Sequence, residues 1–284
     1  MRIAVTGAAG RLGRQVVDRA LRAGHEVVAI DLPGSPAQED GGRPALEWRP
    51  ADVTVLDEVR AALAGVQGVA HLAALPHPRY PEPEVHRINV GGTHNVLIAA
   101  EEHGVSAVCL ASSVNAIGGV FSARPRFDYF PVDEEHPPYC EDSYSQSKWL
   151  VEQQGAAFAR RRPDATFSSL RLNTLQDDWA AAAALGGDEK RAPDLWGWTS
   201  FDSAASAVLL ALHRRTPGHA VYTVVAARTT STTPSEELAR RWYPQVALRA
   251  PLPDCAAFQS SAKALAELGW DAREESPAIS ERER

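Results

Sequence analysis

Short apolar runs alternate with amphipathic stretches along the first two-thirds of the chain. Apolar runs of this length are typical of buried strands, and apolar positions that recur every three or four residues are typical of helices. Strands are predicted at Ile3–Thr6, Glu26–Asp31, Leu46–Asp52, Gly68–Ala74, Ala107–Ser112 and Thr166–Leu172. Helices are predicted at Leu12–Ala23, Val55–Leu63, Val85–His103 and Tyr144–Arg161. Strands separated by such helices predict an α/β fold, a doubly wound parallel sheet with helices on both faces.

The pattern weakens after Leu172, where only short elements are expected. These are an alanine-rich helix with a tail within Asn173–Arg191, a helix at Ser203–His213 capped by Asp202 or Ser203, a strand at Val221–Val225, and a helix at Ser261–Leu268 closed by Gly269. The segment Thr233-Pro234-Ser235-Glu236 has the form of a capping box, with proline in the first helical position. We therefore expect another helix to start there.

Composition narrows the range of partners. The net charge is −7, which argues against a nucleic-acid or anionic-membrane partner because both require a positive face. The three cysteines, Cys109, Cys140 and Cys255, are too few and too widely spaced for a disulfide framework or a zinc site, and we expect no metal. The sequence shows no signal peptide and no apolar run long enough to span a membrane, so a cytoplasmic location is expected.

Three glycines follow the first predicted strand and open the first predicted helix. They allow a tight turn and a close approach of the backbone to a pyrophosphate, whose charge the helix amino terminus stabilises. This strand–turn–helix context is the one that a dinucleotide site requires. We expect cofactor contacts from Gly7, Ala9, Gly10, Arg11, Leu12 and Gly13. The sequence thus predicts a Rossmann-type dinucleotide-binding domain at 1–172 and a small C-terminal substrate lobe at 173–284, with some of its elements returning to the sheet.

Asp31 ends the second predicted strand. Its carboxylate can accept hydrogen bonds from both adenosine ribose hydroxyls and would repel a 2′-phosphate, which favours NAD over NADP. Arg11 and Arg14 oppose this preference, because either can reach a phosphate from the turn or the first helical turn. We give more weight to Asp31, since its charge lies where the 2′-phosphate would be.

Two further polar residues lie at the ends of predicted strands. Asp52, followed by Val53, is expected beside the adenine; alternatively, Asp52 caps the helix that starts near Thr54. His71 is expected to fill space near the cofactor and to take no part in catalysis, because no partner motif accompanies it.

Tyr144 and Lys148 are one helical turn apart and share one helix face. A free tyrosine has a pKa of about 10. A nearby ammonium, together with a positive nicotinamide ring, is expected to favour the phenolate and to lower that pKa. Tyr144 is thereby predicted to accept or donate a proton near neutral pH.

Taken together, these pieces follow the order seen in one enzyme group. They are Thr6–Gly13, Asp31, Asp52, His71-Leu72-Ala73-Ala74, Asn89-Val90-Gly91-Gly92-Thr93, Ser112-Ser113 and Tyr144-Ser145-Gln146-Ser147-Lys148. Over roughly residues 1–215 the chain resembles the extended short-chain dehydrogenases/reductases. That group includes nucleotide-sugar epimerases and dehydratases, as well as the smaller uronate dehydrogenases.

The resemblance implies roles for individual residues. Ser113 would hydrogen-bond the reacting oxygen, since the serine of the group usually stands five positions before a glycine, here Gly118. Tyr144 would transfer the proton, and Lys148 would hold the nicotinamide ribose and tune Tyr144. The resemblance also implies cofactor-pocket positions for Leu72, Ala73, Ala74 and Asn89, the last as a brace for the fourth strand.

Substrate contacts are expected from Ser113, Asn115 and Arg171. Arg171, placed just after the sixth predicted strand, resembles a carboxylate-binding arginine of uronate dehydrogenases. However, Val114 and Asn115 replace the Asn-His pair expected after the serine, which weakens the uronate interpretation.

Two aromatic segments allow more than one interpretation. Ser113 and Tyr144 are separated by 30 residues, and the extra length at Phe121–Phe130 either shapes the substrate mouth or packs as a surface loop. Trp196 and Trp198 are expected in the core and not as ligand-stacking residues.

These features favour an NAD-dependent oxidoreductase that moves hydride between the nicotinamide and a hydroxyl or carbonyl of a small polar substrate, such as a sugar or a uronate. The chain after Leu172 is short for a lobe that grips a nucleotide, which argues against the alternative of a nucleotide-sugar epimerase or dehydratase with tightly bound NAD. A second alternative is a non-catalytic NAD-sensing protein, although such relatives often lack the tyrosine or the lysine. The resemblance also suggests a homodimer formed through the helices Val85–His103 and Tyr144–Arg161.

Overall fold

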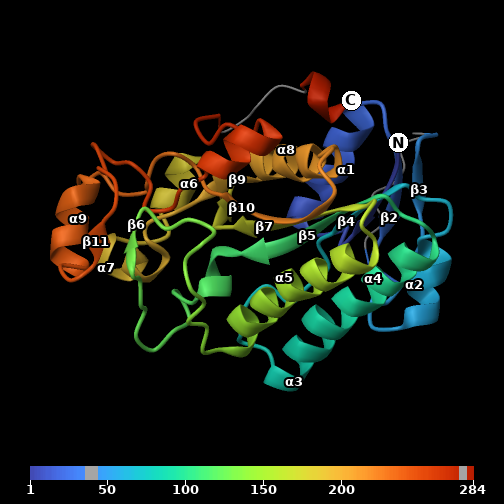
Figure 1. Cartoon of the computed structure of the whole chain (residues 1–284), viewed down its shortest axis with the longest axis horizontal. Coiled ribbons are helices and arrows are strands. Elements are labelled where there is room, and N and C mark those ends of the chain that lie inside the picture. The colour runs from blue at the N-terminus through green and yellow to red at the C-terminus, as the bar shows by residue number, and fades with distance from the viewer. Residues whose placement is uncertain (36–43, 275–279) are drawn as a thin grey trace.

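The fold is built on one parallel sheet. The computed structural model describes residues 1–35, 44–274 and 280–284, and in these residues seven strands pair in the order β10-β7-β5-β4-β1-β2-β3 (Figure 1). The strands are β1 (Arg2–Thr6), β2 (Glu26–Ile30), β3 (Leu46–Trp48), β4 (Gly68–His71), β5 (Ala107–Ser113), β7 (Thr166–Leu172) and β10 (Gly218–Val224). Every neighbouring pair in this sheet is parallel, which confirms the predicted doubly wound α/β architecture.

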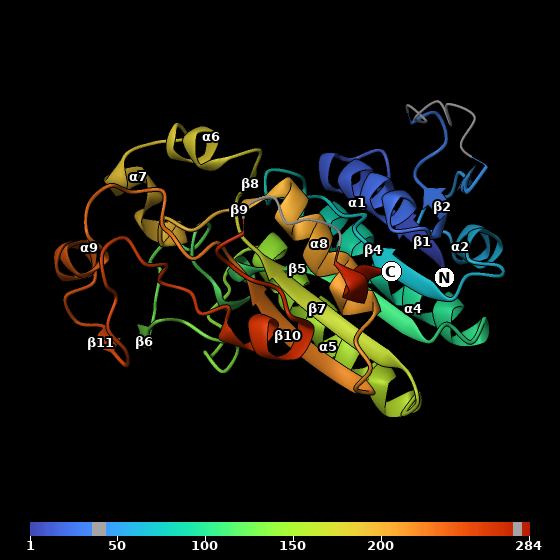
Figure 2. The same cartoon turned by 90° about the horizontal axis from the view of Figure 1, so that it is seen from above.

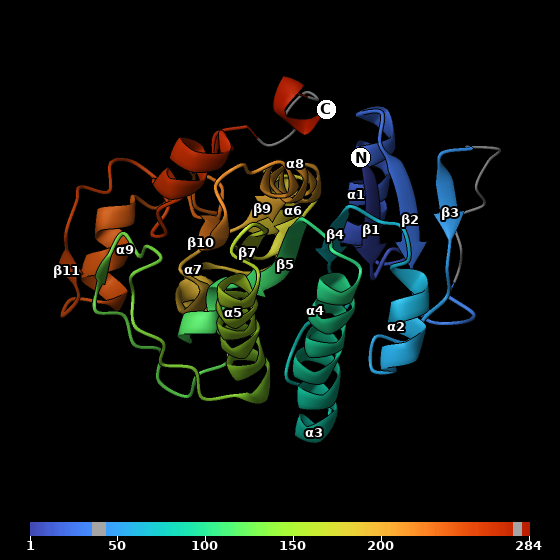
Figure 3. The same cartoon turned by 45° about the vertical axis from the view of Figure 1, so that its right-hand side comes forward.

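Helices cover both faces of the sheet (Figures 1 and 3). One face carries α1 (Arg11–Arg22) and α8 (Phe201–Leu212), and the other carries α2 (Leu56–Ala62), α4 (Gly92–Glu102) and α5 (Ser143–Arg161). The two apolar layers follow from the alternation of side chains along each strand. In β1, Ile3 and Val5 pack towards α1 and α8, whereas Ala4 between them packs towards α2, α4 and α5.

Smaller elements gather beyond the carboxyl ends of the strands, away from the two termini (Figure 2). They are η2 (Val114–Ile117), β6 (Tyr129–Phe130), β8 (Leu175–Gln176), α6 (Trp179–Ala183), α7 (Asp188–Arg191), η3 (Ala192–Asp194), β9 (Thr199–Ser200), α9 (Ser235–Trp242) and β11 (Ala247–Leu248). One apolar cluster packs η2, β6, η3 and α9 together and includes Phe127, Phe130, Trp196, Leu238 and Phe258, whereas α6 packs in a second cluster with Trp198 and Ala226. The expected lobe residues 173–284 thus supply most of this end, while α8 and β10 from the same stretch belong to the layers of the main sheet.

In the first half of the chain, two predicted elements have different bounds in the structure. The third strand ends at Trp48 and does not continue to Asp52. The helix expected over Val85–His103 consists of α3 (Glu82–Val85), a π-helical segment η1 (His86–Gly91) and α4.

The structure differs from the weaker predictions after Leu172 in three places. The alanine-rich helix expected within Asn173–Arg191 is present only as α6, while β8 precedes it and a second short helix, α7, occupies the expected tail. Helix α8 is capped by Ser200, whose hydroxyl accepts a hydrogen bond from the Ser203 amide, and not by Asp202 or Ser203. The capping box at residues 233–236 does not form, because the Thr233 hydroxyl donates to Asp188 and Pro234 stands at the N-cap of α9.

The last predicted helix is present as the π-helical segment η4 (Ala264–Leu268). Gly269 closes it in the left-handed conformation that glycine adopts without strain, as the sequence predicted. The chain ends in a short turn, η5 (Glu281–Glu283), which lies near α1 and α8.

Candidate active site

The site begins at the glycine turn between β1 and α1. Gly7 has a φ of +69°, and a Cβ there would lie 2.8 Å from the backbone nitrogen of Ala73. A Cβ at Gly13 would lie 2.1 Å from the carbonyl oxygen of Gly7. Side chains are therefore excluded at both positions, and the backbone amides at the start of α1 remain open to an anion.

A crevice of about 570 Å³ runs from this turn across the carboxyl ends of the strands. Predicted site residues that line it are Gly7, Gly10, Arg11, Leu12, Gly13, Leu72, Ala74, Ser113, Asn115, Tyr144 and Lys148. The other predicted residues, Ala9, Asp31, Asp52, Val53, Ala73, Asn89 and Arg171, do not line this crevice, and several of them support it from outside.

Asp31 is tied to the glycine turn. Its Oδ2 accepts a hydrogen bond of 2.8 Å from the Ala9 amide, and its Oδ1 accepts from the Leu32 amide and the Ser35 hydroxyl. The Arg11 guanidinium does not pair with Asp31. It pairs with Asp177 at 3.1 Å and lies 4.2 Å from the centre of the Phe201 ring.

Asp52 forms a local turn. Its Oδ1 accepts hydrogen bonds of 2.8 Å from both the amide and the hydroxyl of Thr54. The N-cap of α2 is Val55, so Asp52 orders the residues before the helix and is not its cap. Val53 is buried, and its side chain lies where a Cβ at Gly92 would have to be.

Tyr144, Lys148 and Ser113 meet on one wall of the crevice. Asp142 starts α5 by accepting a hydrogen bond from the Ser145 amide, and this places Tyr144 in the first turn and Lys148 one turn later. The Lys148 ammonium lies 5.7 Å from the centre of the Tyr144 ring and donates to the Ala111 carbonyl at 2.7 Å. The Ser113 hydroxyl accepts from the Asn115 amide at 3.1 Å, which leaves its own proton for another acceptor.

Burial dominates the proton affinities of these groups. It raises the pKa of Tyr144 to about 12, although a hydrogen bond from Ser113 acts in the opposite direction. Burial also lowers the pKa of Lys148 to about 8. The pKa of Tyr144 is therefore raised within the protein itself and not lowered as the sequence predicted, because desolvation dominates.

His71 is buried in a chain of hydrogen bonds. The Thr93 hydroxyl donates its proton to the Asn89 carbonyl at 2.6 Å. It therefore acts as the acceptor for His71 Nε2 at 3.0 Å. His71 Nδ1 then accepts from Thr6 Oγ1 at 2.7 Å, and burial lowers the pKa of His71 to about 3. The residue is thus neutral and structural in its surroundings, and its position agrees with the space-filling role expected from the sequence.

Asn89 supports the segment after β4. Its Oδ1 accepts from the Leu75 amide at 2.8 Å, and its Nδ2 donates to the Leu75 carbonyl and to the Ser147 hydroxyl. Ser147 in turn donates to the Tyr144 carbonyl at 2.7 Å. Asn89 therefore connects the crevice wall after β4 with the first turns of α5.

Arg171 lies within β7 and not after it. Its Nε and Nη2 donate to the two carboxylate oxygens of Glu152, each at 2.9 Å, and its Nη1 contacts the Glu134 carbonyl at 3.4 Å. Both residues of the pair are buried, with side-chain exposures of 8% and 2%. Ser112 also donates to Glu152 at 2.6 Å. The guanidinium expected to face the substrate thus has a carboxylate partner from the protein.

A family model for NAD-dependent epimerases/dehydratases matches residues 3–176. The chain belongs to this family. The finding confirms the predicted membership of the extended short-chain dehydrogenases/reductases, a family of enzymes whose cofactor is NAD. The site described above lies almost entirely within the matched range.

Individual relatives differ in how much of them the chain covers. It is 34% identical over 188 residues to an L-arabinose 1-dehydrogenase (NAD(P)(+)) from Haloferax volcanii, which covers 64% of this chain and 68% of that relative. It is 31% identical over 157 residues to a 3 beta-hydroxysteroid dehydrogenase/Delta 5→4-isomerase from monkeypox virus, which covers 53% of this chain and less than half, 44%, of the viral protein. A uronate dehydrogenase from Agrobacterium tumefaciens is similar in structure, with a TM-score of 0.69 at 21% identity over 95% of this chain and 83% of that one, which shows a shared fold.

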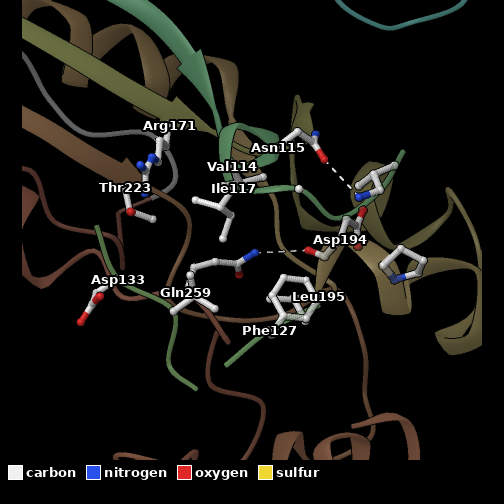
Figure 4. Close-up of a pocket in the computed structure, with 14 residues that line it drawn as sticks. Val114, Asn115, Ile117, Phe127, Asp133, Arg171, Asp194, Leu195, Thr223 and Gln259 are labelled. Atoms are coloured by element: carbon white, nitrogen blue, oxygen red, sulfur yellow. Dashed lines mark hydrogen bonds between the residues drawn. The ribbon is translucent and has the colours of Figure 1, made fainter. Parts of the chain in front are cut away.

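A second, narrower cavity adjoins the crevice behind Asn115 (Figure 4). Asn115, Val120 and Asp194 line both spaces. Asp194 forms an ion pair with Arg191 at 2.8 Å, and burial raises its pKa to about 6 against the lowering effect of that arginine. Gln259 donates to the Asp194 carbonyl at 3.3 Å, while its Oε1 is buried and has no hydrogen-bond partner within the described residues.

Sequence reasoning missed several residues around these spaces. Glu152 carried a usable signal, because it continues the Tyr144–Lys148 spacing by one more helical turn. The others, Asn173, Thr174, Leu175, Asp194, Phe201 and Gln259, belong to segments without a recognisable motif.

The structure also tests the predictions made for Phe121–Phe130 and for Trp196 and Trp198. Phe121 packs edge-on against Tyr144 with ring centres 5.7 Å apart, whereas Phe127 and Phe130 belong to the apolar cluster of the lobe. The Phe121–Phe130 segment therefore serves both the crevice mouth and the packing beneath it. Trp196 and Trp198 are fully buried, as expected of core residues.

Across residues 1–35, 44–274 and 280–284, no three His, Cys, Asp or Glu side chains are grouped so as to hold a metal ion. None of the helices in the same residues combines the length and the apolar character of a membrane span.

Proposed function

We propose that this protein is an NAD-dependent oxidoreductase acting on a hydroxyl or carbonyl group of a small, polar, sugar-like substrate. The observation that carries the proposal is the meeting of Tyr144, Lys148 and Ser113 on one wall of a crevice that starts at a glycine turn. The family and the L-arabinose 1-dehydrogenase relative support it.

The chain's own residues fit a dinucleotide. The glycine turn admits no side chains, so its amides and the start of α1 would hold the pyrophosphate. Asp31 would bind the adenosine ribose and favour NAD, and Lys148 would bind the nicotinamide ribose. Bound NAD would supply the hydride acceptor and a positive charge.

The proton chemistry belongs to Tyr144 and Ser113. Ser113 accepts a hydrogen bond from the Asn115 amide and interacts with the Tyr144 hydroxyl, so with a substrate bound its own proton would turn to the substrate oxygen. Tyr144 holds its proton at neutral pH and would donate it to a carbonyl during reduction. In the oxidation direction the phenolate must be stabilised by positive charge, to which Lys148 contributes.

The decisive variant is Tyr144→Phe, which removes the phenol oxygen and keeps the ring. We expect kcat to fall by about 10²–10⁴-fold while NAD affinity stays within twofold. NADH absorbance with neutral aldoses, uronic acids and small alcohols measures turnover, and calorimetry measures NAD binding. Tyr80→Phe, a change at a half-exposed tyrosine outside the crevice, is the matched control.

The same assay tests the alternatives. An epimerase or dehydratase would convert substrate without net NADH formation, and an NAD sensor would keep its biological role in the Tyr144→Phe variant. Failure of the unmodified protein to bind NAD would contradict the proposal at its first step.

We further propose that residues 173–284, apart from the elements that return to the main sheet, form the substrate lobe and that the protein acts as a cytoplasmic homodimer. Asn173, Thr174 and Asp194 from that range line the crevice. Trp149 and Leu150 on α5 are half-buried and available to a partner helix, whereas Phe158 lies in the core. Light scattering of the purified protein tests the dimer.

A further inference from the structure

One carboxylate contributes to the wall of the main crevice. Among the described residues that line this space of about 570 Å³, the charged side chains are Arg11, Lys148 and Asp194. Arg11 stands at the start of α1 beside the glycine turn, and Lys148 would bind the nicotinamide ribose. Asp194 is therefore the charged group left for the substrate.

Asp194 lies beside the loop that follows Ser113. A Cβ at Gly119 would be 3.1 Å from the carbonyl oxygen of Pro193, the residue before Asp194, and 3.6 Å from Asn115 Oδ1. The Asn115 amide in turn donates to the Ser113 hydroxyl at 3.1 Å. Figure 4 shows Asn115 and Asp194 on neighbouring parts of the wall. These contacts place Asp194 at the Ser113 end of the crevice and not at the glycine turn.

The backbone holds Asp194 in one position. Its carbonyl accepts from the Gly197 amide at 3.1 Å and from Gln259 Nε2 at 3.3 Å, and its Oδ1 accepts from the Trp196 amide at 3.0 Å. The next two residues, Leu195 and Trp196, have φ values of +57° and +54°, which residues other than glycine seldom adopt. Both side chains are buried, and strain that is held by packing in this way is concentrated at functional sites.

The Asp194 carboxylate can accept further hydrogen bonds. An ionised carboxylate offers about four acceptor positions. The Trp196 amide uses one of them, and the Thr174 hydroxyl donates weakly to Oδ2 at 3.5 Å. Arg191 Nε lies 2.8 Å from Oδ2 and balances the charge, but it has no hydrogen-bond partner among the described residues and so uses no acceptor position. About two positions remain for O–H donors of a ligand in the crevice.

We propose that Asp194 binds a hydroxyl group of the substrate away from the reacting carbon and makes the enzyme discriminate against substrates that lack this hydroxyl. The proposal rests on the proposed function, because it concerns the substrate of the same crevice. A half-buried acceptor that faces hydrogen in place of a hydroxyl loses both water and partner, so a deoxy analogue binds less well. Asp194 is thus a specificity-determining residue.

The test combines the Asp194→Asn variant with deoxy sugars. D-Galactose, which has the ring configuration of L-arabinose, is compared with its 2-, 3-, 4- and 6-deoxy analogues at about pH 8, where Asp194 is ionised because its pKa is about 6. For at least one analogue, we expect the unmodified protein to prefer D-galactose by at least about tenfold in kcat/KM. The variant should reduce this preference to within about threefold, mainly through KM, since the amide removes the charge and one acceptor oxygen.

Two further variants separate this contact from general effects. Asp188→Asn changes a carboxylate in the same part of the chain that accepts from the Thr233 hydroxyl and lies outside both spaces, so all preferences should stay within twofold. Asp194→Asn/Arg191→Gln removes both buried charges and avoids an unpaired arginine, and it should lose the same preference as the single variant. Calorimetry with NAD should give affinities within twofold for all variants, which shows that each is folded.

Binding is measured separately from turnover, by saturation-transfer NMR of each sugar with the NADH-loaded protein. Equal binding of D-galactose and all its deoxy analogues by the unmodified protein, binding of none of these sugars, or an unchanged preference in both Asp194 variants would overturn the proposal. Absence of NADH formation, despite a preference in binding that depends on Asp194, would instead refute the proposed function and leave the role of Asp194 supported.

Discussion

Lys148 keeps a positive charge in a buried position. Its ammonium donates to the Ala111 carbonyl, yet burial lowers its pKa from the usual value near 10.5 to about 8. The folded state therefore binds the proton less tightly than the unfolded state does, and the charge opposes folding wherever it is present. Lys148, which would bind the cofactor ribose, thus lowers the free energy of unfolding.

Replacing Lys148 by methionine should stabilise the protein while abolishing turnover. At pH 7 we expect the free energy of unfolding to rise by about 1–2 kcal/mol, reduced by the loss of the bond to Ala111. The gain should shrink as the pH rises from 8 to 10.5, because the folded wild-type protein then sheds the proton that penalises it. Urea unfolding followed by circular dichroism at pH 7 and at pH 10 measures this. A gain that does not change with pH would show that the charge is not its cause.

Single residues also show where sequence reasoning succeeds. Tyr144 and Lys148 were predictable because a helix places residues four apart on one face, and Asp31 because it follows a strand at a known distance from the glycine turn. The spacing could have drawn attention to Glu152, but its ion pair with Arg171 was not predictable, since only the fold brings the two residues together.

At the scale of elements, the turn between β1 and α1 requires glycine at positions 7 and 13, where a side chain would collide with the backbone. Gly13→Ala would place a Cβ 2.1 Å from the Gly7 carbonyl oxygen and push the start of α1 away. We expect a loss of about 1–3 kcal/mol in stability and at least about a tenfold loss in NAD affinity. Calorimetry with NAD and thermal unfolding measure the two effects.

Gly91→Ala is the control for that change. A Cβ at Gly91 meets no atom within 4 Å, and its φ of −64° suits any residue. It should leave NAD affinity unchanged and raise stability by up to about 1 kcal/mol. Equal effects of the two substitutions would mean that the glycine turn has no special role.

The elements themselves were predictable to different degrees. Strands such as β2 and β5 contain apolar runs, and the helices show apolar positions at helical spacing, so the sheet and its two layers can be predicted from the sequence. After Leu172, two-residue strands such as β8 and β9 exist only because they pair with each other, and no local pattern encodes them. The part of the site formed by Asn173, Thr174 and Asp194 was missed for the same reason.

At the scale of the whole molecule, the two ends of the described chain are joined. Glu283 in the terminal turn binds Arg19 of α1 with both carboxylate oxygens, and Asp202 at the start of α8 lies 3.2 Å from the same guanidinium. Glu283 and Arg19 are both buried, and the Glu283 carbonyl also bonds His25. This buried contact fixes α1 from the side opposite the glycine turn.

Glu283→Gln should weaken the whole fold. Although burial alone would raise the Glu283 pKa, the hydrogen bonds from Arg19 and Ser280 lower it below 4.5 overall. Its stabilising effect is therefore present above about pH 4.5 and is lost as the pH falls through the lowered value. We expect a loss of about 2–4 kcal/mol at pH 7 that diminishes below pH 4.5, measured by urea unfolding. Glu281→Gln, an exposed change in the same turn, should have almost no effect, and a similar loss there would contradict this account.

The distance along the chain between Arg19 and Glu283, 264 positions, has a consequence for biosynthesis. Helix α1 leaves the ribosome early, whereas Asp202 and Glu283, whose carboxylates pair with its arginine, are translated late. Until residue 283 has emerged, the end of that helix opposite the glycine turn lacks its ion pair with Glu283. A nascent chain stalled before that point should be captured poorly by an immobilised adenine dinucleotide.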